Sequence, residues 1–103
     1  MAHSRHQRDQ AALIQRRVFI KGRVQGVSFR ASTERAAAQF PQMQGFVRNL
    51  PDGRVEAVFA GQQEEVLFMV AWCKKGPLLA KVRELEVHEE GYDSNLNLFR
   101  IEK

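Results

Sequence analysis

Short β-prone runs alternate with two helix-prone stretches along this 103-residue chain, and this order constrains the fold more than any other feature. In the run 17–21, Val18 and Ile20 share one face, because strand side chains point alternately to the two faces. From Ser28 to Phe40 the apolar period becomes helical. The side chains that form the helical stripe are Phe29, Thr33, Ala36, Ala37 and Phe40.

The second half of the chain repeats this alternation. Pro41 ends the first helix, and strands are predicted over 45–50 and 54–60. The Pro51-Asp52-Gly53 turn joins those strands into a hairpin. Inward-facing side chains on the second strand are Val55, Ala57 and Phe59.

A second helix is predicted over 62–75, ending at Gly76-Pro77, with strands following over 80–87 and 98–101. Its expected core stripe is Val66, Met69, Val70 and Cys73. The β-α-β-β-α-β order predicts a ferredoxin-like α+β sandwich, in which two helices cover one face of an antiparallel sheet. A short C-terminal strand is added to that sheet.

We expect residues 1–15 to be a flexible polar leader and residues 16–103 to be one domain. The chain has a net charge of +4. Residues 1–17 contribute +3 of it, and residues 18–103 contribute +1. A nearly balanced domain favours a local anion site over a broad nucleic-acid-binding face.

Cys73 is the single cysteine, which excludes an internal disulfide and a multi-cysteine metal site, and we expect its thiol to be buried. The longest apolar run, Val66 to Cys73, is far shorter than the ~20 residues of a membrane span. No apolar signal-peptide region follows the N-terminus. We therefore expect a cytoplasmic protein without a membrane partner.

The stretch Gly22-Arg23-Val24-Gln25-Gly26-Val27-Ser28-Phe29-Arg30 leads from the first strand into the first helix. A glycine-containing loop before a helix presents several backbone N–H groups in one direction, where the helix dipole favours anions. Arg30 lies in the first helical turn, where a cation opposes the dipole, so a phosphate-binding role would explain it. The alternative is an ordinary strand–helix connection with a surface arginine.

Asn49 lies at a strand end, in Gly45-Phe46-Val47-Arg48-Asn49-Leu50-Pro51-Asp52-Gly53. Such an asparagine often serves the adjacent turn. Alternatively, its amide both donates and accepts hydrogen bonds, so it could hold a water molecule.

Together these two stretches resemble the acylphosphatase family signature, and the Gly76-Pro77 helix end is also similar to that family. The resemblance covers about residues 16–103, with a looser match at 97–101. It implies the ferredoxin-like fold and the hydrolysis of acyl phosphates to carboxylate and inorganic phosphate, by a monomer without a metal or cofactor.

The resemblance also assigns roles to residues. Arg30 matches the phosphate-binding arginine and Asn49 the water-orienting asparagine, so these two are the candidate catalytic residues. The backbone cradle for the phosphate matches Gln25, Gly26, Val27, Ser28 and Phe29.

Two binding modules are alternatives. RNA-recognition domains share the β-α-β-β-α-β order, but they need aromatic side chains on the third strand, where this chain offers only Phe59. The second alternative is a module that handles carbamoyl phosphate without turnover of its own. Intact Arg30 and Asn49 favour an enzyme over such a module.

Overall fold

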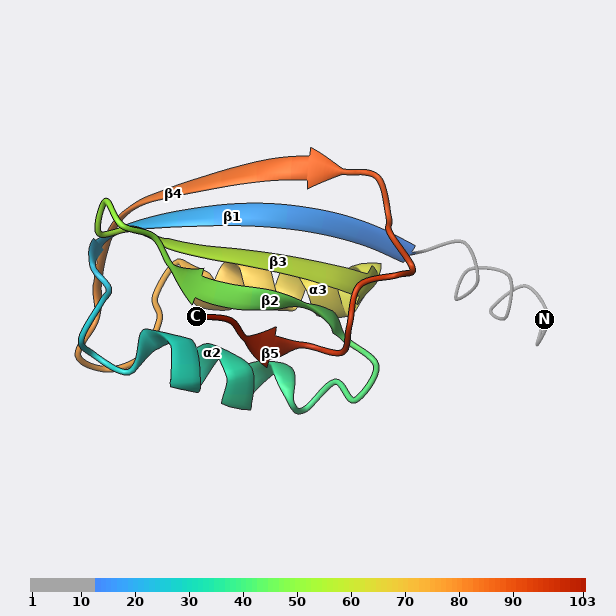
Figure 1. Cartoon of the computed structure of the whole chain (residues 1–103), viewed down its shortest axis with the longest axis horizontal. Helices are drawn as coiled ribbons and strands as arrows, with labels where there is room; N and C mark the ends of the chain where they lie inside the picture. Colours follow the sequence, from blue (N-terminus) through green and yellow to red (C-terminus); the bar gives the residue numbers. More distant parts are fainter. Residues whose placement is uncertain (1–12) are drawn as a thin grey trace, which may run out of the picture.

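The computed structural model describes residues 13–103, and the predicted order of strands and helices is present (Figure 1). The elements are β1 (Leu13–Arg23), α2 (Phe29–Ala37), β2 (Gln44–Asn49), β3 (Val55–Gln62), α3 (Gln63–Cys73), β4 (Lys81–Glu90) and β5 (Arg100–Ile101). The strands form one sheet in the order β4-β1-β3-β2-β5.

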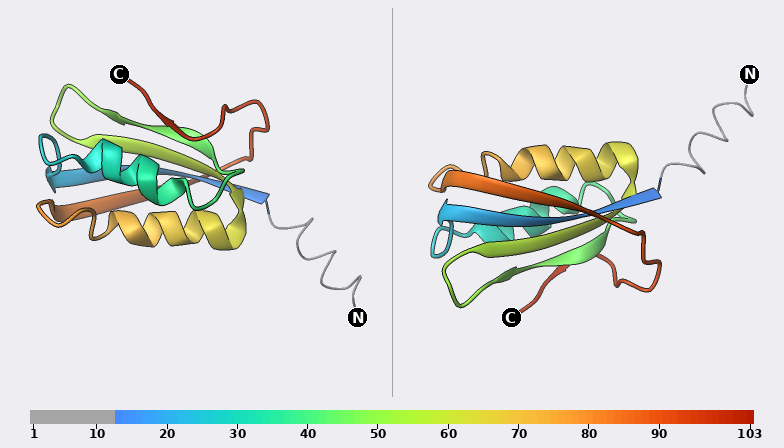
Figure 2. Two further views of the ribbon diagram at one scale, coloured as in Figure 1. Left: turned by 90° about the horizontal axis from the view of Figure 1, so that it is seen from below. Right: turned by 90° about the horizontal axis from the view of Figure 1, so that it is seen from above.

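Both helices lie on the same face of this sheet, so they are in front of it in one view of Figure 2 and behind it in the opposite view. Strand pairs β1–β3, β1–β4 and β2–β3 are antiparallel. The ferredoxin-like prediction is therefore confirmed. The short strand β5 pairs parallel to β2 at the edge, which makes the sheet mixed.

The core fills the space between the sheet and the helices. Val18 and Ile20 of β1 are fully buried, as are the predicted inward-facing residues of β3. The predicted stripe of α3 is confirmed, because its buried residues are Val66, Met69, Val70 and Cys73. Burial raises the pKa of the Cys73 thiol, which keeps this side chain protonated and unreactive.

Two strands are longer than predicted. β1 begins at Leu13, so 13–15 of the predicted leader belong to a strand, and 1–12 lie outside the described residues. β4 continues to Glu90, which pairs with Gln15 in the sheet register. The prediction missed these ends because polar side chains, among them the buried Gln15 of β1 and Glu89 and Glu90 of β4, interrupt the apolar alternation.

The first helix is shorter than predicted and ends at Ala37 instead of Phe40. Its last turn tightens, since the amide of Phe40 donates to the carbonyl of Ala37. A residue before a proline also avoids helical backbone angles, so Pro41 disfavours a helical Phe40. The last strand is likewise reduced to Arg100–Ile101.

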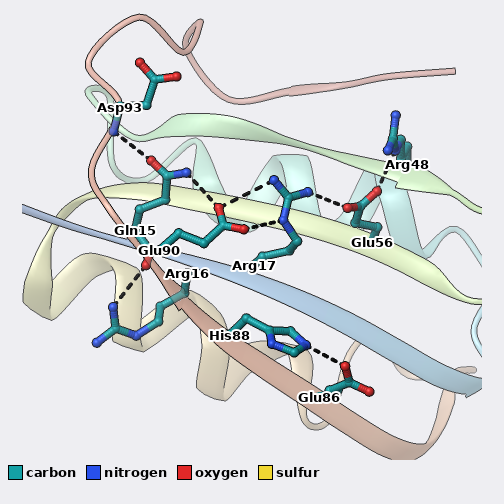
Figure 3. A network of polar contacts seen from close by, with 9 residues as sticks. All are labelled: Gln15, Arg16, Arg17, Arg48, Glu56, Glu86, His88, Glu90 and Asp93. Atoms are coloured by element: carbon teal, nitrogen blue, oxygen red, sulfur yellow. Dashed lines mark hydrogen bonds and ion pairs between the residues drawn. The ribbon is translucent and has the colours of Figure 1, made fainter.

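The sheet face opposite the helices is covered by a network of ion pairs (Figure 3). The carboxylate of Glu56 accepts hydrogen bonds from Arg17 and from Arg48, at 2.6 Å for the Arg48 Nε atom. Arg17 also donates to Glu90, which accepts a further bond from Gln15. These pairs explain how a carboxylate as buried as Glu56 is tolerated.

This face does not provide the stacking platform of an RNA-recognition domain. Phe59, the aromatic residue on β3, is fully buried on the helix side and stacks on Phe99 at a centroid distance of 5.2 Å. Phe19 on the open face is covered by the guanidinium of Arg54, 4.8 Å from the ring centre. Bases therefore find no bare aromatic surface on the third strand.

Within residues 13–103, neither helix is long and apolar enough to cross a membrane.

The Glu90–Arg17 pair predicts a pH-dependent contribution to stability. The hydrogen bond from Arg17 lowers the pKa of Glu90 below its ordinary value of 4.5. A carboxyl whose pKa is lowered on folding stabilises the folded state above the ordinary pKa, and this contribution is lost as pH falls through the lowered value. The Glu90→Gln substitution should therefore cost about 0.5–1 kcal/mol at pH 7 and less at pH 3.

Urea unfolding at the two pH values measures this difference. Glu89→Gln is the control, because Glu89 is largely exposed and lies 3.8 Å from its partner Arg16. A Glu90→Gln cost that stays constant between pH 7 and pH 3 would contradict the assignment.

Candidate active site

The end of β1 and the loop that leads to α2 contain the unusual backbone that the glycines predict. Gly22, near the end of β1, has a φ angle of 135°, and Gly26 in the loop has one of 75°. Ser28, the N-cap residue of α2, also has a positive φ of 61°. A non-glycine residue in this region is uncommon and is held there by its surroundings, often at a functional site.

The amides at this end of α2 are available to a ligand. Within residues 13–103, no backbone carbonyl accepts a hydrogen bond from the amides of residues 26–31, and the first helical bond runs from Ser32 to Ser28. The Ser28 side chain does not cap the helix, and the first turn contains no acidic residue. Unpaired amides together with the positive end of the helix dipole favour an anion at this position.

A pocket of about 450 Å³ brings most of the predicted site residues together. Among its lining residues, none is acidic, and the charged ones are Arg30 and Lys103. This charge suits an anion. The lining consists of Val24, Gly26, Ser28, Phe29, Arg30, Ala31, Asn49, Ile101 and Lys103.

Arg30 differs from most other arginines of the protein in its partners. Within residues 13–103, five other arginines form ion pairs with carboxylates. They are Arg16, Arg17, Arg48, Arg54 and Arg100. In the part of the chain that the structure describes, Arg30 has no such pair. Its guanidinium is therefore free to bind an anionic ligand beside the loop amides.

Asn49 is the last residue of β2, where it pairs in register with Val55 of β3. The turn that follows is closed by its neighbours, through hydrogen bonds from the Leu50 amide to Arg54 and from the Gly53 amide to Leu50. Asp52 adds a side-chain bond to the Arg54 amide. The side chain of Asn49 is thus not needed for the turn, and the residue lines the pocket with Arg30.

Two predicted cradle residues, Gln25 and Val27, are not among the lining residues of this pocket. Val27 packs against the hydrophobic core. The side chain of Gln25 points to the β2–β3 turn, where its Nε2 atom donates to the carbonyls of Leu50 and Arg54. Only their backbone amides remain as candidates for binding a ligand.

Ile101 and Lys103 line the pocket although sequence reasoning did not select them. β5 brings them there, because Ile101 pairs in parallel with Val47 and the Glu102 amide donates to the Val47 carbonyl at 2.9 Å. The sequence predicted a strand over 98–101 but gave no sign that it pairs with β2, which places its end at the pocket.

The start of α2 is anchored by Phe29. Its ring is 2% exposed and meets Trp72 edge to face at a centroid distance of 5.7 Å. Gly76, which ends α3 with a φ of 68°, lies against the same ring. A Cβ atom at Gly76 would be 2.5 Å from the Phe29 ring, so the glycine is required sterically. The predicted Gly76-Pro77 stop therefore also supports the phosphate loop.

A second, larger pocket offers no cation for a phosphate, and the described residues include no metal-binding cluster. That pocket, of about 970 Å³, lies among Leu13, Pro41, Tyr92 and Leu98, and its lining contains Glu65 but no lysine or arginine. A phosphate would find no cation there. Across residues 13–103, no three His, Cys, Asp or Glu side chains are grouped so that they could hold a metal ion.

Comparisons with known proteins point to one family. The acylphosphatase family model matches residues 16–101. An acylphosphatase from Syntrophus aciditrophicus (strain SB) is 52% identical over 84 residues, which are 82% of this chain and 86% of the relative. One from Chloroflexus aurantiacus is 51% identical over 89 residues, covering 86% and 96%. The solved structure of an acylphosphatase from Coxiella burnetii has a TM-score of 0.81 at 30% identity, covering 91% and 97%.

The Phe29–Gly76 contact predicts a long-range effect on the site. Gly76→Ala should destabilise the protein by about 1–3 kcal/mol, because the new methyl group overlaps the ring and the backbone angle is unfavourable. It should also weaken phosphate binding, because the new methyl group would shift Phe29 and, with it, the neighbouring loop amides. Urea unfolding and phosphate titration measure the two effects.

Gly91→Ala is the matched control, because no atom lies within 4 Å of a Cβ at that position. Wild-type phosphate affinity in folded Gly76→Ala protein would show that the contact does not support the loop.

Proposed function

The chain belongs to the acylphosphatase family and hydrolyses the carboxyl–phosphate bond of acyl phosphates, and from this premise we propose how its residues share the reaction. Arg30 and the amides of the β1–α2 loop bind the phosphoryl group, and Asn49 positions the attacking water. The observation that carries this proposal is the shared pocket, where an arginine without a carboxylate partner lies with unpaired amides and Asn49.

Phosphoryl transfer needs position and charge stabilisation more than covalent help. In the transition state, negative charge is spread over the three equatorial phosphate oxygens. The planar guanidinium of Arg30 can donate to two of them, and the loop amides can donate to the third. The amide donors are part of the backbone of the loop, so their direction needs little reorganisation during the reaction.

Asn49 needs only to orient the water molecule. The water oxygen bonds to phosphorus as the bond between phosphorus and the carboxylate oxygen breaks. An amide can accept one hydrogen bond from this water and donate another, but it does not remove a proton. The proposed proton acceptor is a phosphate oxygen of the substrate, which leaves inorganic phosphate as the product.

The leaving group explains why the pocket works without an acid. An acyl phosphate releases a carboxylate, and side-chain carboxyl groups have a pKa of about 4. Such a leaving group departs without protonation at neutral pH. Accordingly, the ionisable side chains among the pocket's described lining residues are an arginine and a lysine, with no carboxyl group or histidine.

We also propose that the enzyme acts as a monomer in the cytoplasm. The open sheet face supports the first part, since the Arg17, Arg48, Glu56 and Glu90 pairs cover it with charge instead of an apolar patch. Size-exclusion chromatography with light scattering tests the oligomeric state.

Substitutions at the two catalytic positions should have different effects. Arg30→Ala should abolish both benzoyl phosphate hydrolysis and inhibition by inorganic phosphate, because the principal cation is lost. Asn49→Ala should leave phosphate inhibition nearly unchanged and lower kcat by about 10²–10³-fold, the range for removal of one positioned transition-state contact. Steady-state kinetics with phosphate as a competitive inhibitor measures both.

Arg35→Ala is the matched control for Arg30, because Arg35 is an exposed arginine on the same helix whose guanidinium donates to the Ser32 hydroxyl. It should keep wild-type kinetics. Full activity of Asn49→Ala would remove the water-orienting role.

The side chains that line the pocket also predict that hydrolysis does not need a metal ion. Because the side chains of the described lining residues include no carboxylate, imidazole or thiolate, they are a poor ligand set for a divalent cation. Dialysis against EDTA should leave the hydrolysis rate unchanged, and added Mg²⁺ should not raise it. A loss of activity with EDTA that Mg²⁺ restores would refute the metal-free mechanism.

A further inference from the structure

The side chain of Gln25 connects the two halves of the proposed site. Its Nε2 atom donates one hydrogen bond to the Leu50 carbonyl and one to the Arg54 carbonyl, each at 2.9 Å. The amide nitrogen of glutamine has two protons, so both are used. The side chain is partly buried, which limits competition by water for these bonds.

The two acceptors are the residues that close the β2–β3 turn. The amide of Leu50 donates to the carbonyl of Arg54 at 2.8 Å, so Gln25 binds the turn at the point where its strands meet. Asn49 immediately precedes Leu50 in the chain. Gln25 itself lies between Val24 and Gly26, two loop residues that line the pocket.

In the sheet, the loop and the turn are linked only indirectly, because Val55 of β3 pairs with Ile20 of β1 on one side and with Asn49 of β2 on the other. The loop and the turn are 25 and 29 residues apart at these contacts, and they belong to different connections of the sheet. β1 and β2 are not neighbours, because β3 lies between them. Backbone pairing between adjacent strands therefore cannot align the loop directly with Asn49.

We propose that Gln25 is a positioning residue, which holds the water-orienting Asn49 at a fixed distance from the phosphate loop. This inference rests on the proposed function. Gln25 acts through its side chain and the turn, and it touches neither the phosphate nor the water. A displacement of about 1 Å in such a geometry costs about 10²-fold in rate.

Gln25→Met tests the inference because methionine has a similar length and no donor. The expected result is a kcat lowered about 10- to 100-fold, with the inhibition constant of inorganic phosphate within about twofold of wild type. Arg30 and the loop amides remain, so phosphate still binds. Gln25→Glu is the second variant, because it keeps the shape and places a carboxylate against two carbonyls.

Gln39→Met is the control, since Gln39 also donates from Nε2 to a backbone carbonyl, that of Ala36, on the exposed surface of the protein. It should leave both constants unchanged. All rates are measured well below the melting temperature of each variant, where circular dichroism reports native protein. A lower melting temperature with unchanged kcat in both Gln25 variants would overturn the positioning role.

A double-mutant cycle separates this inference from the proposed function. If Gln25 acts through Asn49, Gln25→Met should lower the rate little further in the Asn49→Ala background. Independent, multiplicative losses would overturn the inference while leaving the role of Asn49 intact. Wild-type activity of Asn49→Ala alone would instead refute the proposed function.

Discussion

The geometry of the active site depends on the burial of one side chain, Phe29. This residue begins α2, and its ring fits between Trp72 and Gly76 at the end of α3. An exposed loop would otherwise adopt many conformations. Ordering it costs about 1–2 kcal/mol of conformational entropy for each residue. The buried ring offsets part of that cost, and it fixes the direction of the amides on either side of it. Catalytic positioning is thus obtained from the same apolar packing that holds the helices to the sheet.

Charged side chains have different partners on the open face of the sheet and at the pocket beside α2. On the open face of the sheet, Arg17 and Arg48 have carboxylate partners, and Glu56 is shared between them. These pairs permit polar side chains on β1 and β3 without an exposed apolar surface. Arg30 lies at the end of the sandwich, where the lining of the pocket includes no acidic residue. Arginines on the open face of the sheet are thus neutralised by carboxylates, whereas Arg30 has no carboxylate among the residues that line its pocket.

Sequence reasoning identified what is encoded locally. The alternation of Val18 and Ile20, and the stripe Val66, Met69, Val70 and Cys73, predicted the buried faces, because burial imposes these periods directly. Arg30 and Asn49 were selected because each lies beside glycine or turn residues that limit the local backbone, and the structure places both at one pocket. The ends of β1 and β4 were missed, since Gln15 and Glu90 look like loop residues until their partners across the sheet are known.

The long-range features of the site could not be predicted from local patterns. The bonds from Gln25 to Leu50 and Arg54 join segments that no sequence period relates. The same is true of Gly76, whose contact with Phe29 spans two connections of the fold. Both residues occur in stretches that already have an ordinary explanation, as a loop residue and as a helix stop.

The parallel pairing of β5 with β2 has a consequence for the synthesis of the protein. Ile101 and Lys103 line the same pocket as the loop residues Gly26 and Ser28, more than seventy positions earlier in the chain. Translation proceeds from the amino end, so the phosphate loop leaves the ribosome long before this wall of its pocket. A nascent chain can bury Phe29 and pair its central strands, yet its pocket stays open on one side. The enzyme therefore acquires its complete site only when residues 101–103 have emerged and β5 has joined the sheet.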